Sequence, residues 1–471
     1  MMIDRRQFLS HGLAATAALS ALSQRGFASA TDSTTDSATD ILRAAPVRAQ
    51  IAPSPYPETE IWAYGGTLPG TEIRLRQGTP LRRVFDNGLP EPSTIHWHGI
   101  RLDNAMDGVA GLTQEAVAPG AQFTYEFTPP DAGTYWYHAH TRSFEQVARG
   151  LYGPLIIEEP EPPQVDGEEV LVLDDLLLDP ETAQFDPDFE APHDRSHAGR
   201  LGNLIVTNGQ FALRREVQQH ARLRLRLINA ANARVFTLGL SGLEGWVMAL
   251  DGMPLATPLP ASEPLALGPG QRADLFVDVV AAEGEIADLV QFTREGGLSQ
   301  VAFAVTGQAS LARRDAPAAL PPNPAMEVTG LAGARRLAMP IEGGAMGGLR
   351  AAQYQGREQG MGDLVAANQF WALGGIVGLS DAPLAEMSRG ETVQLDLDNR
   401  TAFPHAMHLH GMHFREVLAD GSFGPMRDTI LMQRGERRSV AFMADNPGKW
   451  LFHCHMLGHA ASGMTSWIEI S

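Results

Sequence analysis

FTPPDAGTYWYHAH at residues 127–140 lies over FMADNPGKWLFHCH at residues 442–455 without a gap, at an offset of 315 residues. The leading phenylalanine, one glycine, the aromatic positions and both final histidines coincide. A second pair, HWHG at 96–99 and HLHG at 408–411, matches at an offset of 312 residues. Because two separate segments share nearly one offset, we interpret the first and last thirds of the chain as copies of one domain.

The segments around these repeats have the alternating pattern of β-strands. Apolar and polar residues alternate at 123–127, 222–227 and 393–397, and Asn-Gly, Asp-Gly and Pro-Gly turns separate such stretches. LGPGQRADLFVDVV at 267–280 echoes VAPGAQFTYEF at 117–127, so the middle third carries a fainter copy without paired histidines. The sequence therefore predicts an all-β protein of three tandem Greek-key β-sandwich domains, with few helices.

Length and composition agree with three domains. The 471 residues correspond to about three units of ~150 residues. A formal net charge of −19 argues against nucleic acid as a partner, and the single cysteine excludes an intramolecular disulfide. No run of about 20 apolar residues predicts a membrane span. The predicted boundaries place domain 1 at 46–160, domain 2 at 161–310, a linker at 311–330 and domain 3 at 331–471.

The N-terminus has the features of an export signal. Arg5-Arg6 precedes a moderately apolar stretch at 12–22, and Ala28-Ser29-Ala30 offers a small-residue cleavage site. The alternative is an amphipathic N-terminus with two chance arginines. The order of the three features favours a twin-arginine signal peptide at 1–30, a flexible tether at 31–45, and a periplasmic location.

Histidines cluster in four short blocks. Ten of the fifteen lie there: His96, His98, His138, His140, His405, His408, His410, His453, His455 and His459. On a strand, His-x-His places both imidazoles on one face, and clustered histidines are typical of metal ligands. We expect the isolated residues His11, His193, His197 and His220 to be hydrogen-bonded core histidines instead.

The last block predicts two different metal centres. Cys454 faces away from His453 and His455, so its thiolate is free to join His405, His459 and the thioether of Met464 in a blue-copper set. The eight other imidazoles, four from each outer domain, then suit a three-copper cluster at the interface between these domains. In this scheme His96 and His408 bind one copper, and a pair of coppers takes the other six, namely His98, His138, His140, His410, His453 and His455.

With these motifs the chain resembles a three-domain multicopper oxidase of the bacterial laccase and cuprous-oxidase type, over essentially its whole mature length. The resemblance implies cupredoxin-like domains and four copper ions: one type 1, one type 2 and a type 3 pair. It also implies four one-electron oxidations at the blue copper, coupled to reduction of oxygen to water, in a protein expected to be a monomer. Ala139 stands where the other copy has Cys454, so only one blue site is expected.

The resemblance also points to an acid for oxygen reduction. In relatives an acid eleven residues after the first ligand histidine lies near the cluster, and here it is Asp107. The alternative role for Asp107 is a simple Asp-Gly turn with Gly108. Many bacterial relatives carry a glutamate where this chain has Ala460, and a proline where it has Ala406. The first departure calls the usual proton route into question and leaves water or another acid to serve instead, and the second affects loop stiffness rather than ligation.

The substrate is predicted from what the chain lacks. Cuprous-oxidase relatives carry a methionine-rich insertion, whereas residues 339–366 hold only Met339, Met346 and Met361, which we expect in flexible loops. With an open, apolar approach to His459, we expect small phenols or aromatic amines as substrates. The alternative is a cuprous-ion oxidase for copper tolerance. A copper-free cupredoxin scaffold and a trimeric nitrite reductase are the remote alternatives.

Overall fold

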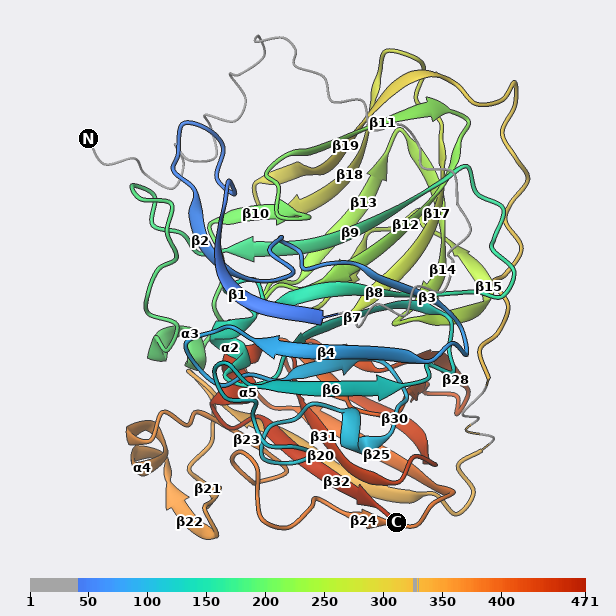
Figure 1. Cartoon of the computed structure of the whole chain (residues 1–471). Helices are drawn as coiled ribbons and strands as arrows, with labels where there is room; N and C mark the ends of the chain where they lie inside the picture. The colour runs from blue at the N-terminus through green and yellow to red at the C-terminus, as the bar shows by residue number, and fades with distance from the viewer. Residues whose placement is uncertain (1–40, 325–327, 329) are drawn as a thin grey trace.

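The computed structural model describes residues 41–324, 328 and 330–471 (Figure 1). The predicted signal peptide lies outside the described residues, as does the predicted tether up to residue 40. Residues 41–45 were also expected in that tether, but they belong to strand β1, and the side chains of Leu42 and Ala44 are buried. The ordered chain therefore begins earlier than the sequence indicates, because an apolar residue at every second position pairs this segment into a sheet.

The first sandwich consists of two four-stranded sheets, ordered β2-β1-β4-β6 and β3-β8-β7-β5. Its elements are β1 (Ile41–Ala49), β2 (Thr59–Tyr64), β3 (Ile73–Arg76), β4 (Leu81–Asn87), β5 (Ile95–His98), the 3-10 helix η2 (Asn104–Met106), β6 (Gln122–Phe127), β7 (Gly133–Ala139), α2 (Ser143–Gln146) and β8 (Tyr152–Glu158).

The second sandwich has a six-stranded sheet, β10-β9-β12-β17-β14-β15, and a five-stranded sheet, β11-β19-β18-β13-β16. Its elements are β9 (Gly167–Leu176), α3 (Pro192–Ser196), β10 (Leu204–Thr207), β11 (Leu213–Gln219), β12 (Arg222–Asn229), β13 (Phe236–Ser241), β14 (Leu243–Leu250), β15 (Met253–Pro260), β16 (Leu265–Leu267), β17 (Arg272–Val279), β18 (Ile286–Thr293) and β19 (Gly296–Gln308).

The third sandwich pairs the sheet β23-β20-β25-β30-β27-β28 with β24-β32-β31-β26-β29, and β21-β22 forms a separate hairpin. Its elements are β20 (Arg335–Gly343), β21 (Ala351–Tyr354), β22 (Arg357–Gly360), α4 (Met361–Ala366), β23 (Trp371–Leu373), β24 (Glu386–Met387), β25 (Glu391–Asn399), β26 (His405–Leu409), β27 (Phe414–Val417), β28 (Phe423–Arg427), β29 (Thr429–Met432), β30 (Arg437–Ala444), β31 (Gly448–Cys454), α5 (Leu457–Ala461) and β32 (Thr465–Ile470).

The all-β fold of three sandwiches agrees with the sequence pattern, and the outer two share one apolar core. One buried cluster joins residues of 42–157 to residues of 339–470, whereas the middle sandwich has a core of its own. Figure 1 shows the first sandwich, in blue and cyan, lying between the green second and the red third. The first and third sandwiches thus share one core, so side chains of the repeated segments can meet.

In strand β12 leucine and arginine alternate, but tertiary contacts bury both faces of the strand. Its leucines face the core of the second sandwich, but the alternating arginines are also buried. Arg224 pairs with Glu159 at 2.7 Å and with Asp274, and Arg226 donates to Thr134 of the first sandwich at 2.9 Å. A polar strand face here marks an interface between sandwiches filled by ion pairs.

Two groups of residues differ from their expected places. Met339 lies buried in β20 and Met361 begins α4, whereas Met346 is 82% exposed in a loop. The expectation of a flexible methionine segment is therefore wrong for the first two. His193 is also not a core residue, because its side chain is 77% exposed.

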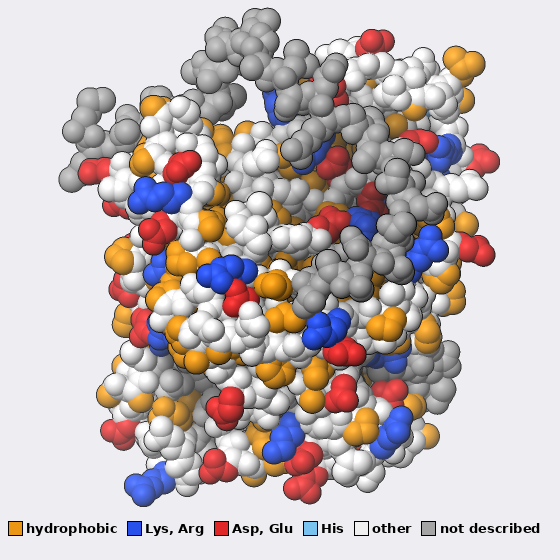
Figure 2. Space-filling view, viewed as in Figure 1, with side chains coloured by type: hydrophobic (Ala, Val, Ile, Leu, Met, Phe, Trp, Pro, Cys, Tyr) orange, Lys and Arg blue, Asp and Glu red, His pale blue; other side chains and the backbone are white. Residues whose placement is uncertain are grey.

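Surface and membrane features are simple. Figure 2 shows acidic and basic side chains interspersed over the displayed face, so the negative net charge does not gather there in one patch. Within the described ranges, no helix is long and apolar enough to cross a membrane.

Candidate metal centres

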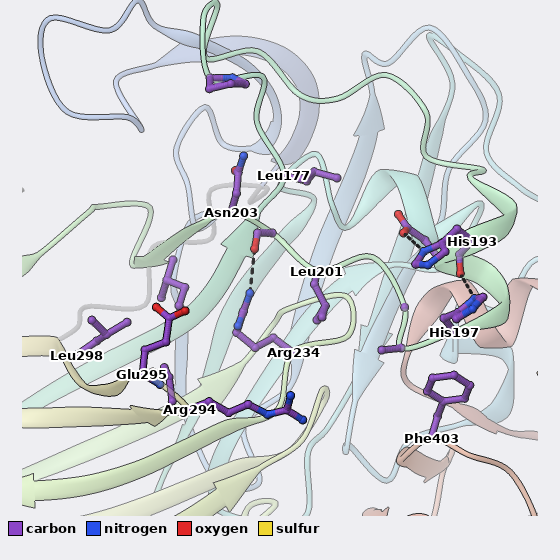
Figure 3. Close-up of a pocket in the computed structure, with 17 residues that line it drawn as sticks. Leu177, His193, His197, Leu201, Asn203, Arg234, Arg294, Glu295, Leu298 and Phe403 are labelled. Atoms are coloured by element: carbon purple, nitrogen blue, oxygen red, sulfur yellow. Dashed lines mark hydrogen bonds and ion pairs between the residues drawn. The ribbon is translucent and has the colours of Figure 1, made fainter. Parts of the chain in front are cut away.

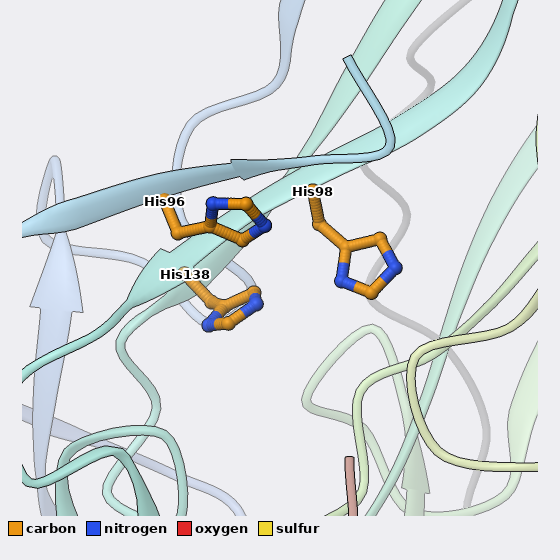
Figure 4. A group of neighbouring side chains, drawn as sticks. All are labelled: His96, His98 and His138. Atoms are coloured by element: carbon orange, nitrogen blue, oxygen red, sulfur yellow. The ribbon is translucent and has the colours of Figure 1, made fainter. Parts of the chain in front are cut away.

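Strands β5 and β7 bring the first four histidines together. They are antiparallel neighbours, with His96 opposite His138 and His98 opposite Trp136. Because side chains alternate along a strand, the imidazoles of one His-x-His pair share a face, and opposite positions bring the two pairs into contact. Figure 4 shows His96, His98 and His138 on this common face, and one nitrogen of each lies within 4.8 Å of the others.

The same pairing in the third sandwich separates two kinds of ligand. In β26 and β31, His408 lies opposite His453 and Met407 lies opposite Cys454. Alternation along β26 therefore puts His405 on the face of Cys454, and His408 on the opposite face with His453. The register of these two strands therefore divides the histidines: His405 lies on the face of the thiol, and His408 and His453 lie on the opposite face.

The two histidine faces meet across the interface between the first and third sandwiches. The rings of His96 and His410 stack at 3.8 Å between centroids, and those of His98 and His408 stack at 3.7 Å. His455 reaches His138 with 3.4 Å between their Nε2 atoms. Seven of the eight cluster histidines predicted from the sequence thus form overlapping groups, which include His140, His410 and His453, and the eighth, His455, joins them through its contact with His138.

The hydrogen bonds of these rings suit metal binding. His96, His138, His408 and His453 each donate from Nδ1 to a backbone carbonyl at 2.9–3.0 Å. An Nδ1 that donates a proton leaves Nε2 unprotonated, which is the form that binds a metal. The backbone carbonyl bound to Nδ1 of each ring therefore leaves Nε2 as the nitrogen that can bind a metal.

Several ring nitrogens lack the partner that a buried polar atom requires. Among the described residues, Nε2 of His96 and His408 and Nδ1 of His98 are buried without a hydrogen bond. The Nε2 atoms of His410 and His453 face each other at 3.1 Å. Because an orphaned buried acceptor costs free energy, a cation between these nitrogens fits the observed arrangement.

Burial keeps several of the imidazoles in their neutral form. Desolvation lowers the pKa of His140 to about 3 and the pKa of His459 to about 4. The same cause, assisted by neighbouring histidines, holds the pKa values of His138 and His453 well below the usual range. Neutral imidazole is the ligand form, so the donor set is ready for metal at physiological pH.

The thiol group lies apart from the eight-histidine cluster. Cys454 Sγ is 3.7 Å from Nδ1 of His405 and 3.9 Å from Nδ1 of His459, and these two nitrogens are 3.1 Å apart. Met464 is buried, and its carbonyl accepts a hydrogen bond from the Cys454 amide at 3.1 Å. Burial raises the pKa of the Cys454 thiol to about 12, so a thiolate in this place needs a bound cation.

The outer nitrogens of this group are also occupied. Thr401 Oγ1 lies 2.8 Å from Nε2 of His405, and Nε2 of His459 donates to the carbonyl of His197 at 2.8 Å. His459 is fully buried, and Trp371 packs against its ring at 4.4 Å. The expectation of an open approach to His459 is therefore wrong, because a backbone segment of the middle sandwich covers it.

Asp107 reaches the cluster as the resemblance implies. Its buried carboxylate is 3.0 Å from Nδ1 of His410 and 3.2 Å from Nδ1 of His96. Asp107 also ends the 3-10 helix η2, and Gly108 follows with φ of +81°. The turn and the contact with the histidines coexist in one residue.

Asp428 and Arg272 complete the site and were missed from the sequence. Asp428 Oδ1 accepts from Nε2 of His98 at 3.1 Å, and Arg272 donates to both carboxylate oxygens at 2.9 and 2.7 Å. Although burial alone would raise the pKa of Asp428, Arg272 and His98 hold it well below the usual range. A single Asp-Thr pair before a strand carries no spacing signal that could have revealed this role.

The middle sandwich also closes the cluster with a glycine. Gly270 has φ of +82°, and a Cβ there would lie 2.8 Å from the His455 ring and 3.0 Å from His98. The turn before β17 lies in the segment 267–280, whose sequence resembles 117–127, and this turn positions both Gly270 and Arg272. The middle third contributes more than spacing between the outer two.

The comparisons with known proteins agree with this geometry. Multicopper oxidase family models match residues 47–162 and 356–471. The chain is 29% identical to multicopper oxidase MmcO of Mycobacterium tuberculosis, covering 99% of this chain and 96% of that protein. It is 26% identical to copper resistance protein A of Pseudomonas syringae pv. tomato, covering 85% and 88%.

Two solved structures are similar over nearly the whole chain. A multi-copper oxidase from Pseudomonas thermotolerans is 35% identical, with a TM-score of 0.79 and coverage of 92% of this chain and 98% of that one. Lac15 from a marine microbial metagenome is 41% identical, with a TM-score of 0.75 and coverage of 92% and 100%. Fold and donor set together define an oxygen-dependent copper oxidoreductase built of cupredoxin-like domains. The chain belongs to the multicopper oxidase family, which uses four copper ions: one type 1, one type 2 and a type 3 pair.

Proposed function

We propose that this multicopper oxidase removes single electrons from phenols or aromatic amines, and that four such oxidations reduce one oxygen molecule to two waters. The observation that carries the proposal is the pairing of β26 with β31. This pairing directs Cys454 to one side and His453 and His455 to the other. One short stretch of backbone therefore joins a thiol-centred donor group to an eight-imidazole group.

The ligand roles follow from the two faces. For the type 1 copper we assign His405, Cys454, His459 and Met464. For the other three coppers the proposed ligands are His96 and His408 at type 2, with His98, His138, His140, His410, His453 and His455 at the type 3 pair. Copper supplies reversible one-electron chemistry and the binding and reduction of oxygen at these sites.

The protein's own residues orient and connect these groups. Carbonyl acceptors fix the tautomers of four imidazoles, and Asp428 fixes that of His98. Cys454 is the covalent link, since its two chain neighbours are both cluster histidines. Asp107 is the proposed catalytic acid, because its carboxylate contacts His96 and His410 in a buried place where Ala460 offers no alternative acid.

The remaining assignments concern the whole molecule. We propose that residues 41–160, 161–310 and 331–471 are the three domains, with 311–330 linking the second to the third; the first domain includes 41–45 because these residues belong to β1. The twin-arginine motif supports export to the periplasm, with signal residues 1–30 removed. A cluster interface lying within one chain supports a monomeric enzyme.

The first experiment counts copper and measures oxygen uptake in the same preparation. We expect about four coppers per chain and a blue absorption band, and oxygen uptake with a methoxyphenol without added copper. Cys454→Ser should lose the blue band and one copper, while the other three remain. The conservative control Ser422→Ala, in an exposed turn, should retain all four.

The same assay separates the alternatives. Uptake with Cu(I) alone, or with the phenol only when excess Cu(II) is present, would identify a cuprous-ion oxidase instead. A protein that binds no copper would be a scaffold.

A further inference from the structure

A pocket of about 820 Å³ lies beside the covered face of His459. Its walls come from the 177–205 segment, the β18–β19 turn and the loop before β26 (Figure 3). Figure 3 shows His193 and His197 on one side above Phe403, with Arg294, Glu295 and Leu298 across the opening. An aromatic molecule fits a cavity with mainly apolar walls and a few polar groups of this kind.

A single backbone strip separates this pocket from the buried histidine. His197, Ala198 and Gly199 line the pocket, and the His197 carbonyl accepts the hydrogen bond from His459 Nε2 at 2.8 Å. Gly199 has φ of +86°, and a Cβ there would lie 2.4 Å from Ala233 Cβ. The strip is therefore packed tightly against Ala233. A molecule in the pocket is separated from His459 by the peptide group that carries the His197 carbonyl.

The imidazole of His197 presents an acceptor toward the same space. Its Nδ1 lies 3.0 Å from the carbonyl of His193, which can only accept, and 3.0 Å from the hydroxyl of Ser196. Since that hydroxyl donates its one proton to the carbonyl of Pro192 at 2.7 Å, Nδ1 is the donor to His193 and Nε2 keeps a lone pair. His193 stacks on the ring at 4.1 Å with an interplanar angle of 13°, and Phe403 meets it at 5.8 Å. The ring is held between two aromatic neighbours while its outer nitrogen remains available.

We propose that His197 is a catalytic residue that accepts the hydroxyl proton of a phenolic substrate bound in this pocket. The proposal rests on the proposed function and names the group that handles the substrate proton. The phenol O–H bond breaks, and an N–H bond forms at His197 Nε2. The phenol is oxidised by one electron to a neutral phenoxyl radical, and the copper that His459 would help to hold would supply the acceptor for that electron.

The position of His197 distinguishes it from other acceptors in the pocket. Asp194 and Glu295 also offer carboxylates, but His197 is the lining residue whose backbone bonds directly to His459. A hydroxyl on His197 Nε2 is therefore bound to the residue whose carbonyl is hydrogen-bonded to His459. Proton and electron then leave the substrate toward one residue, the proton to its ring and the electron past its carbonyl.

The test compares a reductant that loses a proton with one that does not. In the copper-loaded protein, His197→Phe keeps a ring between His193 and Phe403 but removes the acceptor. We expect kcat/KM for a methoxyphenol to fall about 10²-fold, while kcat/KM for ferrocyanide changes less than about twofold. His220→Asn is the matched control, since His220 bonds to a distant carbonyl, that of Ser310, and has φ of +63°, a backbone conformation that asparagine tolerates.

Binding of 4-nitrophenol, which is too electron-poor to be oxidised readily, gives a readout independent of turnover. His197→Phe should weaken its affinity for the copper-loaded protein about tenfold, the value of one hydrogen bond. His197→Gln should restore affinity, because the amide oxygen accepts a hydrogen bond, but not oxidation of the methoxyphenol, because an amide is not a base.

Each other result overturns the proposal. Equal losses with the methoxyphenol and ferrocyanide would show that His197 only covers His459. Unchanged oxidation of the methoxyphenol in His197→Phe would show that the proton leaves elsewhere. If the wild-type protein oxidised neither reductant, the proposed function would fail, and 4-nitrophenol affinity in the variants would still decide whether His197 binds a phenol.

Discussion

Arg272 donates to both oxygens of the Asp428 carboxylate, at 2.9 and 2.7 Å, and both side chains are completely buried. The pair joins the middle sandwich to the third, and Asp428 in turn orients His98 of the first. All three sandwiches thus meet in one chain of charge-assisted hydrogen bonds. Such outer contacts of a metal ligand set the orientation of the ring and contribute to metal affinity.

Replacing Arg272 should therefore affect both stability and copper. Arg272→Met leaves the Asp428 carboxylate buried without its cation, and we expect the free energy of unfolding to fall by about 3–5 kcal/mol. Urea unfolding measures this loss, and metal analysis should show loss of copper from the cluster. The control is Arg437→Met, whose partner Asp398 lies at the surface, 3.0 Å away. That change should cost no more than about 1 kcal/mol, and similar costs for both variants would contradict the argument.

Gly270 offers a test of the close approach to the cluster. Gly270→Ala introduces a Cβ 2.8 Å from the ring of His455, so we expect loss of copper and reduced oxygen uptake. Gly284→Ala is a matched control, because Gly284 has a similar φ of +87° and nothing within 4 Å of an added Cβ. The difference in unfolding free energy between the variants should be about 1–3 kcal/mol, the usual cost of overpacking. Equal effects would mean that only backbone strain matters.

Asp107→Asn should slow oxygen reduction without emptying the sites. The amide has the shape of the carboxylate but cannot deliver a proton, so we expect kcat to fall about 10²-fold with four coppers retained. Oxygen uptake and copper analysis measure the two quantities. Asp103→Asn, at the exposed start of the same short helix, should keep full activity. A loss of copper equal to the loss of rate would point to a purely structural role for Asp107.

The copper-free protein should lose stability as the pH falls below about 6.5, the pKa of an unfolded histidine. Burial lowers the pKa of His140 to about 3 and that of His459 to about 4 in the folded protein. Above pH 6.5 both states are neutral at these residues, so they contribute no pH dependence. Below it the unfolded state binds protons that the folded state rejects, at about 1.4 kcal/mol per pH unit for each histidine.

Urea unfolding of the copper-free protein between pH 7.5 and 5.5 measures this slope. The control is His193→Gln, which removes an exposed histidine that belongs to neither histidine group. A free energy of unfolding that stays flat across this window would contradict the assignment of buried, neutral imidazoles.

Much of the metal site could be predicted because its rule is local. His-x-His on a strand places two rings on one face, and a cysteine between two histidines must face the other way. The repeat of these segments in the outer thirds then indicated which rings meet. His405 shares the face of Cys454 because Met407 lies opposite Cys454, and His405 is two residues before Met407 on the same strand.

Contacts between residues far apart in the sequence could not be predicted from it. The alternating arginines of β12 suggested an ordinary polar face, but acidic partners from other strands bury Arg224 completely. His197 was expected to be a hydrogen-bonded core histidine, but its side chain is half-buried and lines a pocket, and its carbonyl covers His459. Neither contact has a fixed spacing along the chain, so no pattern in the sequence could reveal it.

The sequence by itself thus determined which side chains are of the copper-ligand type and which of them share a strand face, because ligand type and strand periodicity are properties of a few neighbouring residues. Only the tertiary structure decided which nitrogen of each ring faces the cluster, which carboxylate orients His98, and what separates a substrate from His459. These depend on hydrogen-bond partners brought together from all three sandwiches, and burial away from water gives such partners their energetic weight.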